Sequence, residues 1–495
     1  MGSLRALLGP VSSSLAALGL FLVLHASPNL DPRLPAPGFH FWVVSGTSLL
    51  AFVLALVVGV VGVRARDARI VFLGAGFAGL GGFFALHGLA TPGYLIEAAA
   101  AVDGAGHAGG AYGHGAGPSE DPAGSGSSTV VAVAAQLSVA SLAAWMFAAA
   151  YLRPADERMP LGGLLAGWTG VLVAAVVIGL VRPEWASFVP VDQDPLRWAT
   201  TAGVFLLLAP AGARFLEGYR LSRSGLHLVM LYVVGWIAVT QLIMILGEVY
   251  QLSWWLYHAV LLAAVAAVLA TVARQMQAGK ATSALGALLS DDAERRLSYG
   301  LRPEVRALVV ATEARDRYTG GHMLRVADHA VRIGRVLSLG PDSLRALAQA
   351  GVVHDVGKIE VPDAVLNKPG RLDDDEFERV RQHPVAGVRI GQALGMHRPE
   401  LEIIRHHHER WDGGGYPDGL KGAAIPRLAR VLAVADVFDA LTSDRSYRTA
   451  WCAERAISHI EREAGTAFDP ACAGALREAL RGVVHGGADA GTART

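Results

Sequence analysis

The chain has 495 residues, of which 43 are basic and 43 acidic, so its formal charge at neutral pH is zero. This length is too great for one ordinary domain, and nearly all the long apolar runs fall before about residue 273. The two cysteines, Cys452 and Cys472, exclude a disulfide scaffold and fit a reducing compartment. We therefore expect an apolar N-terminal part and a charged C-terminal part with separate tasks.

Eight apolar segments of the N-terminal part are long enough to cross a bilayer, which takes roughly 20 mostly apolar residues. They cover residues 7–26, 41–63, 70–90, 129–152, 161–181, 198–216, 226–247 and 254–273. The first follows Arg5 as a signal peptide would, but no small-x-small cleavage site comes after it. We expect a multi-pass domain at 1–273 that lies in the lipid bilayer and acts as a sensor, with seven spans as the alternative.

Basic residues gather in alternate short loops, and such loops normally face the cytoplasm. The richer set of loops holds Arg64, Arg66, Arg69, Arg153, Arg158, Arg220, Arg223, Arg274 and Lys280. The other set holds only Arg33, Arg182 and Arg197. With eight spans, this asymmetry predicts a protein of the inner cell membrane with both termini, and hence the C-terminal part, in the cytoplasm.

Four histidines lie near the predicted outer ends of the spans, namely His25, His40, His87 and His258. Several imidazoles at one membrane face could bind a metal ion or haem, which would make this part a sensor. The alternative is that interfacial histidines simply meet headgroups and water. The external loop at 91–128 is rich in Gly, Ala and Ser, and we expect it to be mobile.

Residues 274–300 connect the two parts. Leucines followed by acidic and basic residues favour an amphipathic helix here, although Gly279 and Gly286 count against an unbroken one. Such a helix could transmit a twist within a dimer or serve as a passive tether. At the other end of the charged part, we expect a disordered tail at 483–495.

The charged part at 301–482 shows apolar residues at helical spacing and little strand-like alternation. One such stripe places His322 in the first turn of a helix and consists of Val326, Ala330, Ile333 and Leu337. A further helix leads into His354 and Asp355, and Gly/Pro-rich loops at 360–371 and 411–427 separate the helical segments. The prediction is an all-α bundle whose facing helices bring polar ligands together.

Histidines and carboxylates are concentrated in this bundle beyond what a core would keep without a metal. Runs at 354–355 and 406–408 are accompanied by His322, His383 and Asp436, whereas both cysteines lie outside these runs. Nitrogen and oxygen ligands without thiolates count against thiolate-binding metals and structural zinc clusters, and they favour iron, manganese or catalytic zinc.

The same residues belong to an ordered set of motifs across about 130 residues. The motifs are ARDRYTGGH at 314–322, HDVGKI at 354–359, LNKPG at 366–370, HP at 383–384, HHHERWDGGGYPDGL at 406–420 and AVADVFDALTSDR at 433–445. With this set, the chain from about 310 to 470 resembles the HD-GYP family of the HD hydrolase superfamily, whose members degrade the bacterial messenger cyclic di-GMP. The resemblance implies an all-helical HD-type hydrolase domain, whereas no family is recognised for the membrane part. Together with the eight spans and the basic loops, it predicts a polytopic transmembrane helical bundle followed by a cytoplasmic HD-type hydrolase domain.

The resemblance also implies which residues act. Its metal ligands map onto His322, His354, Asp355, His383, His407, His408 and Asp436. It also gives Arg445 and Arg448 a phosphate-binding role. From its position one helical turn beyond His354, we add Lys358 to both the catalytic set, with His354 and Asp355, and the substrate-binding set, and we add Tyr416 of the Gly-rich loop to the latter. Two divalent ions would activate a water and hold a phosphate oxygen, which suits a phosphodiester substrate.

One departure from the family concerns the number of ions. Some relatives bind a third metal through a Glu four residues before the first His, whereas this chain has Tyr318 there. We therefore expect two divalent ions, iron or manganese before zinc, and a product that stops at linear pGpG or proceeds more slowly to GMP.

The sequence thus predicts a membrane-anchored, metal-dependent phosphodiesterase for cyclic di-GMP. The alternatives are a receptor that binds the dinucleotide without turnover and a phosphodiesterase for another cyclic dinucleotide. A homodimer is expected, the loop at 415–417 is a candidate contact for a diguanylate cyclase, and no polymeric nucleic acid is expected to bind.

Overall fold

The computed structural model describes residues 2–91, 122–152, 160–188, 194–289, 303–315, 321–368, 370–444 and 449–480. These residues form helices, turns and loops without a β-strand, which confirms the all-α expectation. The chain divides into two compact units whose main boundary falls between Leu289 and Ser290. We call them the N-terminal unit, with helices α1–α10, and the C-terminal unit, with helices α12–α21.

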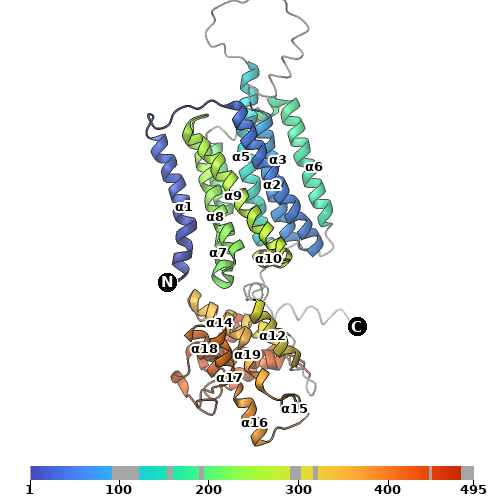
Figure 1. Cartoon of the computed structure of the whole chain (residues 1–495), viewed down its shortest axis with the longest axis vertical. Helices are drawn as coiled ribbons and strands as arrows, with labels where there is room; N and C mark the ends of the chain where they lie inside the picture. The colour runs from blue at the N-terminus through green and yellow to red at the C-terminus, as the bar shows by residue number, and fades with distance from the viewer. Residues whose placement is uncertain are drawn as a thin grey trace, which may run out of the picture. The chain divides into compact units, whose positions relative to one another are not determined.

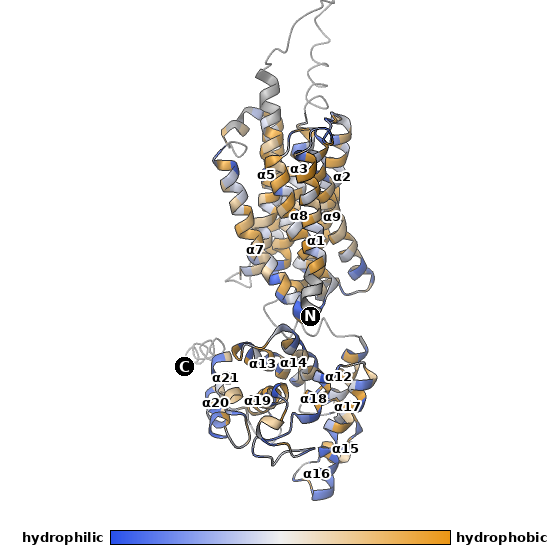
Figure 2. Ribbon diagram, turned by 90° about the vertical axis from the view of Figure 1, so that its left-hand side faces the viewer, coloured by the Kyte–Doolittle hydropathy of each residue, from blue (hydrophilic) through white to orange (hydrophobic). Residues whose placement is uncertain are grey.

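The N-terminal unit contains eight helices that are long and apolar enough to cross a membrane, and each of the eight predicted segments overlaps one of them. They are α1 (Gly2–His25), α2 (Pro37–Ala65), α3 (Ala68–Leu89), α5 (Pro122–Tyr151), α6 (Leu161–Val181), α7 (Leu196–Ser222), α8 (Gly225–Leu246) and α9 (Leu252–Gln277). A 3-10 turn, η1 (Pro183–Phe188), follows α6. Figure 2 shows apolar residues along these helices, and Trp42, Leu56 and Leu206 are exposed, as expected of a surface that meets lipid.

Helix α3 is the most buried helix of this unit, and it packs against α2, α5 and α6 (Figure 1). Its glycines allow close helix contact: a Cβ added to Gly74 would lie 3.0 Å from the backbone nitrogen of Gly59 on α2. Helix α5 begins at Pro122, so the end of the loop predicted at 91–128 is helical instead. Residues 92–121 lie outside the described part of the chain.

The described part of the connector is not one continuous helix, and the break lies at Gly279, one of the two glycines that count against it in the sequence. Helix α9 ends at Gln277 and Gly279 takes a left-handed conformation, with φ of 66°, before α10 (Ala281–Leu289) begins. The apolar side chains of α10, including Leu285 and Leu288, are buried, and α10 packs back against α2, α3, α8 and α9. The connector therefore starts as part of the N-terminal unit, while residues 290–302 are not described.

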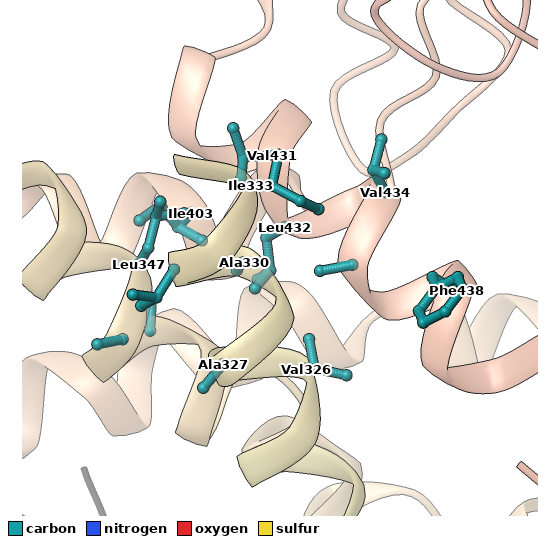
Figure 3. Close-up of a cluster of buried hydrophobic side chains, with 14 of the residues drawn as sticks. Val326, Ala327, Ala330, Ile333, Leu347, Ile403, Val431, Leu432, Val434 and Phe438 are labelled. Atoms are coloured by element: carbon teal, nitrogen blue, oxygen red, sulfur yellow. The ribbon is translucent and has the colours of Figure 1, made fainter. Parts of the chain in front are cut away.

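The C-terminal unit is a bundle of short helices. It contains α12 (Pro303–Arg315), α13 (His322–Val336), α14 (Pro341–Val353), η2 (Val356–Glu360), α15 (Asp363–Leu366), α16 (Asp374–Arg381), α17 (His383–Ala393), α18 (Arg398–His406), η3 (Gly422–Ala424), α19 (Arg427–Thr442), α20 (Ala453–Arg462) and α21 (Pro470–Ala479). Its core joins the apolar faces of α13, α14, α18 and α19 (Figure 3). Val326 and Ile333 of α13 and Leu432 and Val434 of α19 are buried there. This packing fixes the helix ends from which the polar cluster described next is built.

Candidate metal centre

Three histidines of the centre share one local arrangement. His354 directly follows α14, His407 directly follows α18, and His383 opens α17 just after the end of α16. In each, Nδ1 lies 2.7–2.8 Å from the carbonyl oxygen three residues earlier, to which it donates. The last carbonyls of a helix have no partner within the helix, so these imidazoles satisfy a carbonyl while Nε2 is turned inward. His354 and Asp355, predicted on a helix, thus lie just beyond its end.

Asp355 stands between two groups of histidines. Its Oδ1 lies 3.2 Å from Nε2 of His383 and 3.9 Å from Nε2 of His407, and its Oδ2 lies 3.5 Å from Nε2 of His354. A Cβ at Gly357 would overlap the carbonyl oxygen of His383, so only glycine lets η2 approach α17 this closely. Each carboxylate oxygen therefore faces a different set of imidazoles.

These residues form two groups that could each hold an ion. Candidate ligand atoms lie within 4.8 Å of one another in the first group, which consists of Asp355, His383, His407 and His408. The same holds for the second group, which consists of His322, His354 and Asp355. Asp436 adjoins the second group, because its Oδ1 is 3.2 Å from Nε2 of His322 and 3.9 Å from Nε2 of His354. Asp355 is common to both groups.

Nε2 of His322 faces Asp436, while Nδ1 donates to Asp439 over 2.7 Å. Asp439 also accepts from Nε of Arg325 over 2.7 Å. Burial works to lower the pKa of His322, but the hydrogen bonds to Asp436 and Asp439 outweigh it and raise that pKa to about 10. Asp439 thus orients the ring of His322, and Arg325 holds Asp439.

The remaining electrostatics favour neutral imidazoles around an ionised carboxylate. Burial lowers the pKa of His354 to about 4 and also lowers those of His383 and His408. Burial tends to raise the pKa of Asp355, but Lys358 and His354 hold it well below the usual range. A metal ion needs ligands in these protonation states.

Two buried atoms of the centre, Nε2 of His354 and Oδ1 of Asp355, have no hydrogen-bond partner. Leaving buried polar atoms without partners is costly, and in native proteins such atoms call for a water, an ion or a function. Both atoms face the interior of the cluster, and their donor types are those of iron, manganese and zinc sites. The residues present therefore fit a metal centre.

Lys358 approaches the centre from η2. Its Nζ lies 2.7 Å from Oδ2 of Asp355, so the ammonium is held at the edge of the carboxylate that both groups share. A cation in this position can also meet an anionic phosphate that reaches the cluster.

Tyr416 covers one side of the first group. Its ring centroid is 4.9 Å from that of His408 and 6.5 Å from that of His383. The loop carrying it is anchored by Glu409, which accepts hydrogen bonds from the backbone nitrogens of Asp418 and Leu420. Tyr416 therefore contacts the predicted ligands His408 and His383, whereas its predicted role in substrate binding stays a prediction.

Other predicted residues lie apart from the cluster or outside the described chain. His406, set aside in the sequence, contacts Asp418 through Nε2 and the carbonyl of Glu402 through Nδ1. The substrate-binding arginines and the tyrosine that bears on the third metal are not described; they are Arg445, Arg448 and Tyr318.

Sequence reasoning missed three supporting residues. Arg325 lies one turn after His322 on α13, a spacing that could have revealed it, and it binds Asp439. Glu313 accepts hydrogen bonds from the backbone nitrogens at the start of α13. Glu409 anchors the loop after α18, and its place inside the motif at 406–420 is the sequence signal that could have revealed it.

Comparison with known proteins connects this geometry to a family. The HD domain family matches residues 306–472. The cyclic di-GMP phosphodiesterase response regulator RpfG of Xanthomonas campestris pv. campestris is 42% identical over 183 residues, which cover 37% of this chain and 48% of that protein.

Two further relatives differ in their named substrates. A cyclic di-GMP phosphodiesterase of Pseudomonas aeruginosa is 41% identical over 169 residues, covering 34% of this chain and 41% of the relative. The 3'3'-cGAMP-specific phosphodiesterase 2 of Vibrio cholerae is 39% identical over 165 residues, covering 33% of this chain and 32% of the relative. The chain thus spans less than half the length of each of these three relatives.

Proposed function

The C-terminal region of this chain is an HD domain, and we propose that it is a metal-dependent phosphodiesterase that hydrolyses cyclic di-GMP to linear pGpG. The observation that carries the proposal is the position of Asp355. Its two oxygens face two different groups of imidazoles, which is the arrangement a carboxylate needs to bridge two ions.

The proposed centre holds two divalent ions, iron or manganese before zinc. One ion is assigned to Asp355, His383, His407 and His408, and the other to His322, His354, Asp355 and Asp436. When bound, the ions supply the Lewis acidity that phosphodiester hydrolysis needs at neutral pH.

The protein residues position the substrate and hold charge. Lys358 lies beside the shared carboxylate and offers an ammonium to a phosphate oxygen. The ring of Tyr416 forms one wall of the centre, beside His408. Arg445 and Arg448, assigned to the phosphates by resemblance, complete the proposed substrate site.

Two alternatives to a phosphodiesterase specific for cyclic di-GMP remain. A relative named for 3'3'-cGAMP is 39% identical, close to the values for relatives named for cyclic di-GMP, so this dinucleotide is the second candidate substrate. A receptor without turnover is the other alternative, and the complete set of candidate ligands argues against it.

The proposal also places the protein in the inner membrane with the HD domain in the cytoplasm. Its support is the set of eight apolar helices and the basic residues in alternate loops. Protease digestion of right-side-out vesicles should leave the HD domain intact, and its cleavage would reverse the orientation. The homodimer and the diguanylate-cyclase contact through the loop at 415–417 stay predictions.

The direct test uses purified, metal-replete full-length protein in detergent. Chromatography should show many turnovers of cyclic di-GMP to pGpG, at a higher kcat/KM than for 3'3'-cGAMP. His407→Ala should abolish hydrolysis, whereas His406→Ala, one residue away and bonded to Asp418, should retain it. Tight binding of cyclic di-GMP without product would establish the receptor instead, and preferred hydrolysis of 3'3'-cGAMP would change the substrate.

A further inference from the structure

A second histidine cluster lies in the N-terminal unit and has no part in the proposed hydrolysis. His40 on α2, His87 on α3 and His258 on α9 are all buried. Nε2 of His40 lies 3.0 Å from Nε2 of His87 and 2.9 Å from Nε2 of His258. We call these three residues the histidine trio. His25, grouped with them in the sequence, instead stacks on Phe21 within α1.

The hydrogen bonds around the trio determine where its protons lie. Nδ1 of His87 faces the carbonyl oxygen of Val131 over 2.8 Å and can only donate to it. Nδ1 of His40 lies 2.9 Å from the hydroxyl oxygen of Thr91. That hydroxyl donates its single proton to the carbonyl oxygen of His87, so it accepts from His40.

Both rings therefore carry their proton on Nδ1 when neutral, which leaves a lone pair on each Nε2. These lone pairs face each other over 3.0 Å, and the groups that can donate to them are the hydroxyl of Tyr257 toward His87 and Nε2 of His258 toward His40. The same nitrogens converge closely enough that one metal ion could be bound by the Nε2 atoms of all three histidines. An outer hydrogen bond on Nδ1 is the usual support of a metal-ligating histidine.

The spacing fits one ion and leaves no room for a haem. Zn–N bonds of about 2.0–2.1 Å in tetrahedral geometry need nitrogens roughly 3.3 Å apart, so Nε2 of His87 and of His258 would each move away from that of His40 by only a few tenths of an ångström. Two axial histidines of a haem would lie about 4 Å apart with a macrocycle between them, since each iron–nitrogen bond is also about 2 Å long. Three imidazole ligands suit zinc, copper, iron or nickel.

A cavity of about 500 Å³ adjoins the trio and has His40, His87, Tyr257, Gln136 and Tyr250 among its lining residues. Its size is that of a small-molecule site, and its lining is mostly apolar. Three protein ligands leave at least one coordination position open, as in sites that bind an exogenous ligand. The hydroxyl of Tyr257, 3.1 Å from Nε2 of His87, lies on the same side.

We propose that His40, His87 and His258 bind one transition-metal ion through Nε2, with an open coordination position that faces this cavity. The ligand class for that position is a small molecule with a nitrogen, oxygen or sulfur donor. Asp31 fixes the start of α9, the helix that carries His258. It accepts hydrogen bonds from the backbone nitrogen and the hydroxyl of Ser253, over 2.7 and 2.6 Å. The site is independent of phosphodiesterase activity.

The test measures metal rather than hydrolysis. Full-length protein and its variants are stripped with a chelator, reloaded with Zn²⁺ and passed through a desalting column before elemental analysis. His40→Ala and His87→Ala should each retain one ion fewer per chain than His25→Ala. His25 is the matched control because it lies at a helix end of the same unit but outside the trio. Equal metal content in all three variants would overturn the proposal in favour of a hydrogen-bonded cluster.

A gain-of-signal variant guards against misfolding. His258→Cys loaded with Co²⁺ should show a thiolate-to-cobalt charge-transfer band, which the wild-type protein and His25→Cys should lack. The native cysteines cannot supply it, because both Cys452 and Cys472 belong to the C-terminal unit, outside both clusters. A properly folded His258→Cys protein without this band would also overturn the proposal. Neither measurement uses a nucleotide, so failure of the proposed hydrolysis would leave both results unchanged.

Discussion

The two units of the molecule each build a histidine cluster from several helices, but only the C-terminal one includes carboxylates. Asp355 and Asp436 lie among the imidazoles of the HD domain, whereas the trio consists of neutral ligands alone. In the proposed centre, two carboxylates would offset part of the charge of two divalent ions and still leave the site attractive to a phosphodiester. The presence of carboxylates, more than the number of histidines, therefore distinguishes the candidate hydrolytic centre from the candidate sensing site.

The clusters also differ in how their rings are held. In the HD domain, Nδ1 of His354, His383 and His407 donates to a carbonyl only three residues earlier. In the trio, His40 reaches a hydroxyl 51 residues away and His87 a carbonyl 44 residues away. Three rings of the first cluster are thus oriented by local helix ends, whereas His40 and His87 of the trio depend on contacts between helices.

The largest expected effect is that of Asp355→Asn. Loss of the shared carboxylate should remove both ions of the HD centre and lower metal affinity more than about 100-fold, since even outer partners contribute about 10–100-fold. Elemental analysis should show that the ion of the trio remains. Loss of that ion as well would show that the two clusters are not independent. Glu378→Gln, a change at an exposed side chain, serves as control.

A smaller effect is expected from Asp439→Asn, which disturbs the orientation of His322 without removing a ligand. Metal affinity and turnover should fall about 10–100-fold, as for other outer partners of metal-bound histidines. Arg325→Gln should also lower metal affinity and turnover, but by a smaller factor, because Asp439 keeps its hydrogen bond to His322. Metal titration separates this positioning role from a purely structural one, for which thermal stability would fall and metal affinity would not.

Thr91→Val tests the long-range support of the trio. Without the hydroxyl, Nδ1 of His40 loses its acceptor, and Zn²⁺ affinity at the trio should fall about tenfold. Thr271→Val is the matched control, because Thr271 bonds only within its own helix and a nearby arginine. An unchanged affinity in Thr91→Val would mean that the trio, like the HD centre, is oriented locally.

The smallest expected effect is a change in stability from the loss of a helix cap at the protein surface. Helix α16 of the HD domain begins with a capping box between Asp373 and Glu376. Asp373→Ala should lower the free energy of unfolding of the C-terminal unit by about 1 kcal/mol, and chemical denaturation measures the change. Asp375→Ala, which leaves the capping box intact, should have little effect. An equal loss in both would point to general charge rather than capping.

The sequence predicted features that depend on local patterns. The eight apolar helices follow from hydropathy, and the candidate ligands of the HD domain follow from sequence motifs, of which His354 and His407 lie at helix ends. The pairing of Arg325 with Asp439 was missed because it joins helices 114 residues apart. His25 was grouped with the trio because hydropathy alone does not show which helices meet. The break at Gly279 was foreseen as a weakness, but the return of α10 onto other helices was not.

Helix α10 contacts several helices of the N-terminal unit at once, so a movement of any of them can reach it. It packs against α2, α3 and α9, the helices that carry the trio, at the ends remote from His40, His87 and His258, and also against α8. Arg69 at the start of α3 donates to the carbonyl of Leu289, the last residue of α10. Because close-packed side chains resist sliding, a tilt or piston movement of these helices carries α10 with it. The chain consequently leaves the N-terminal unit from a helix whose position is set by the same helices that carry the histidine trio.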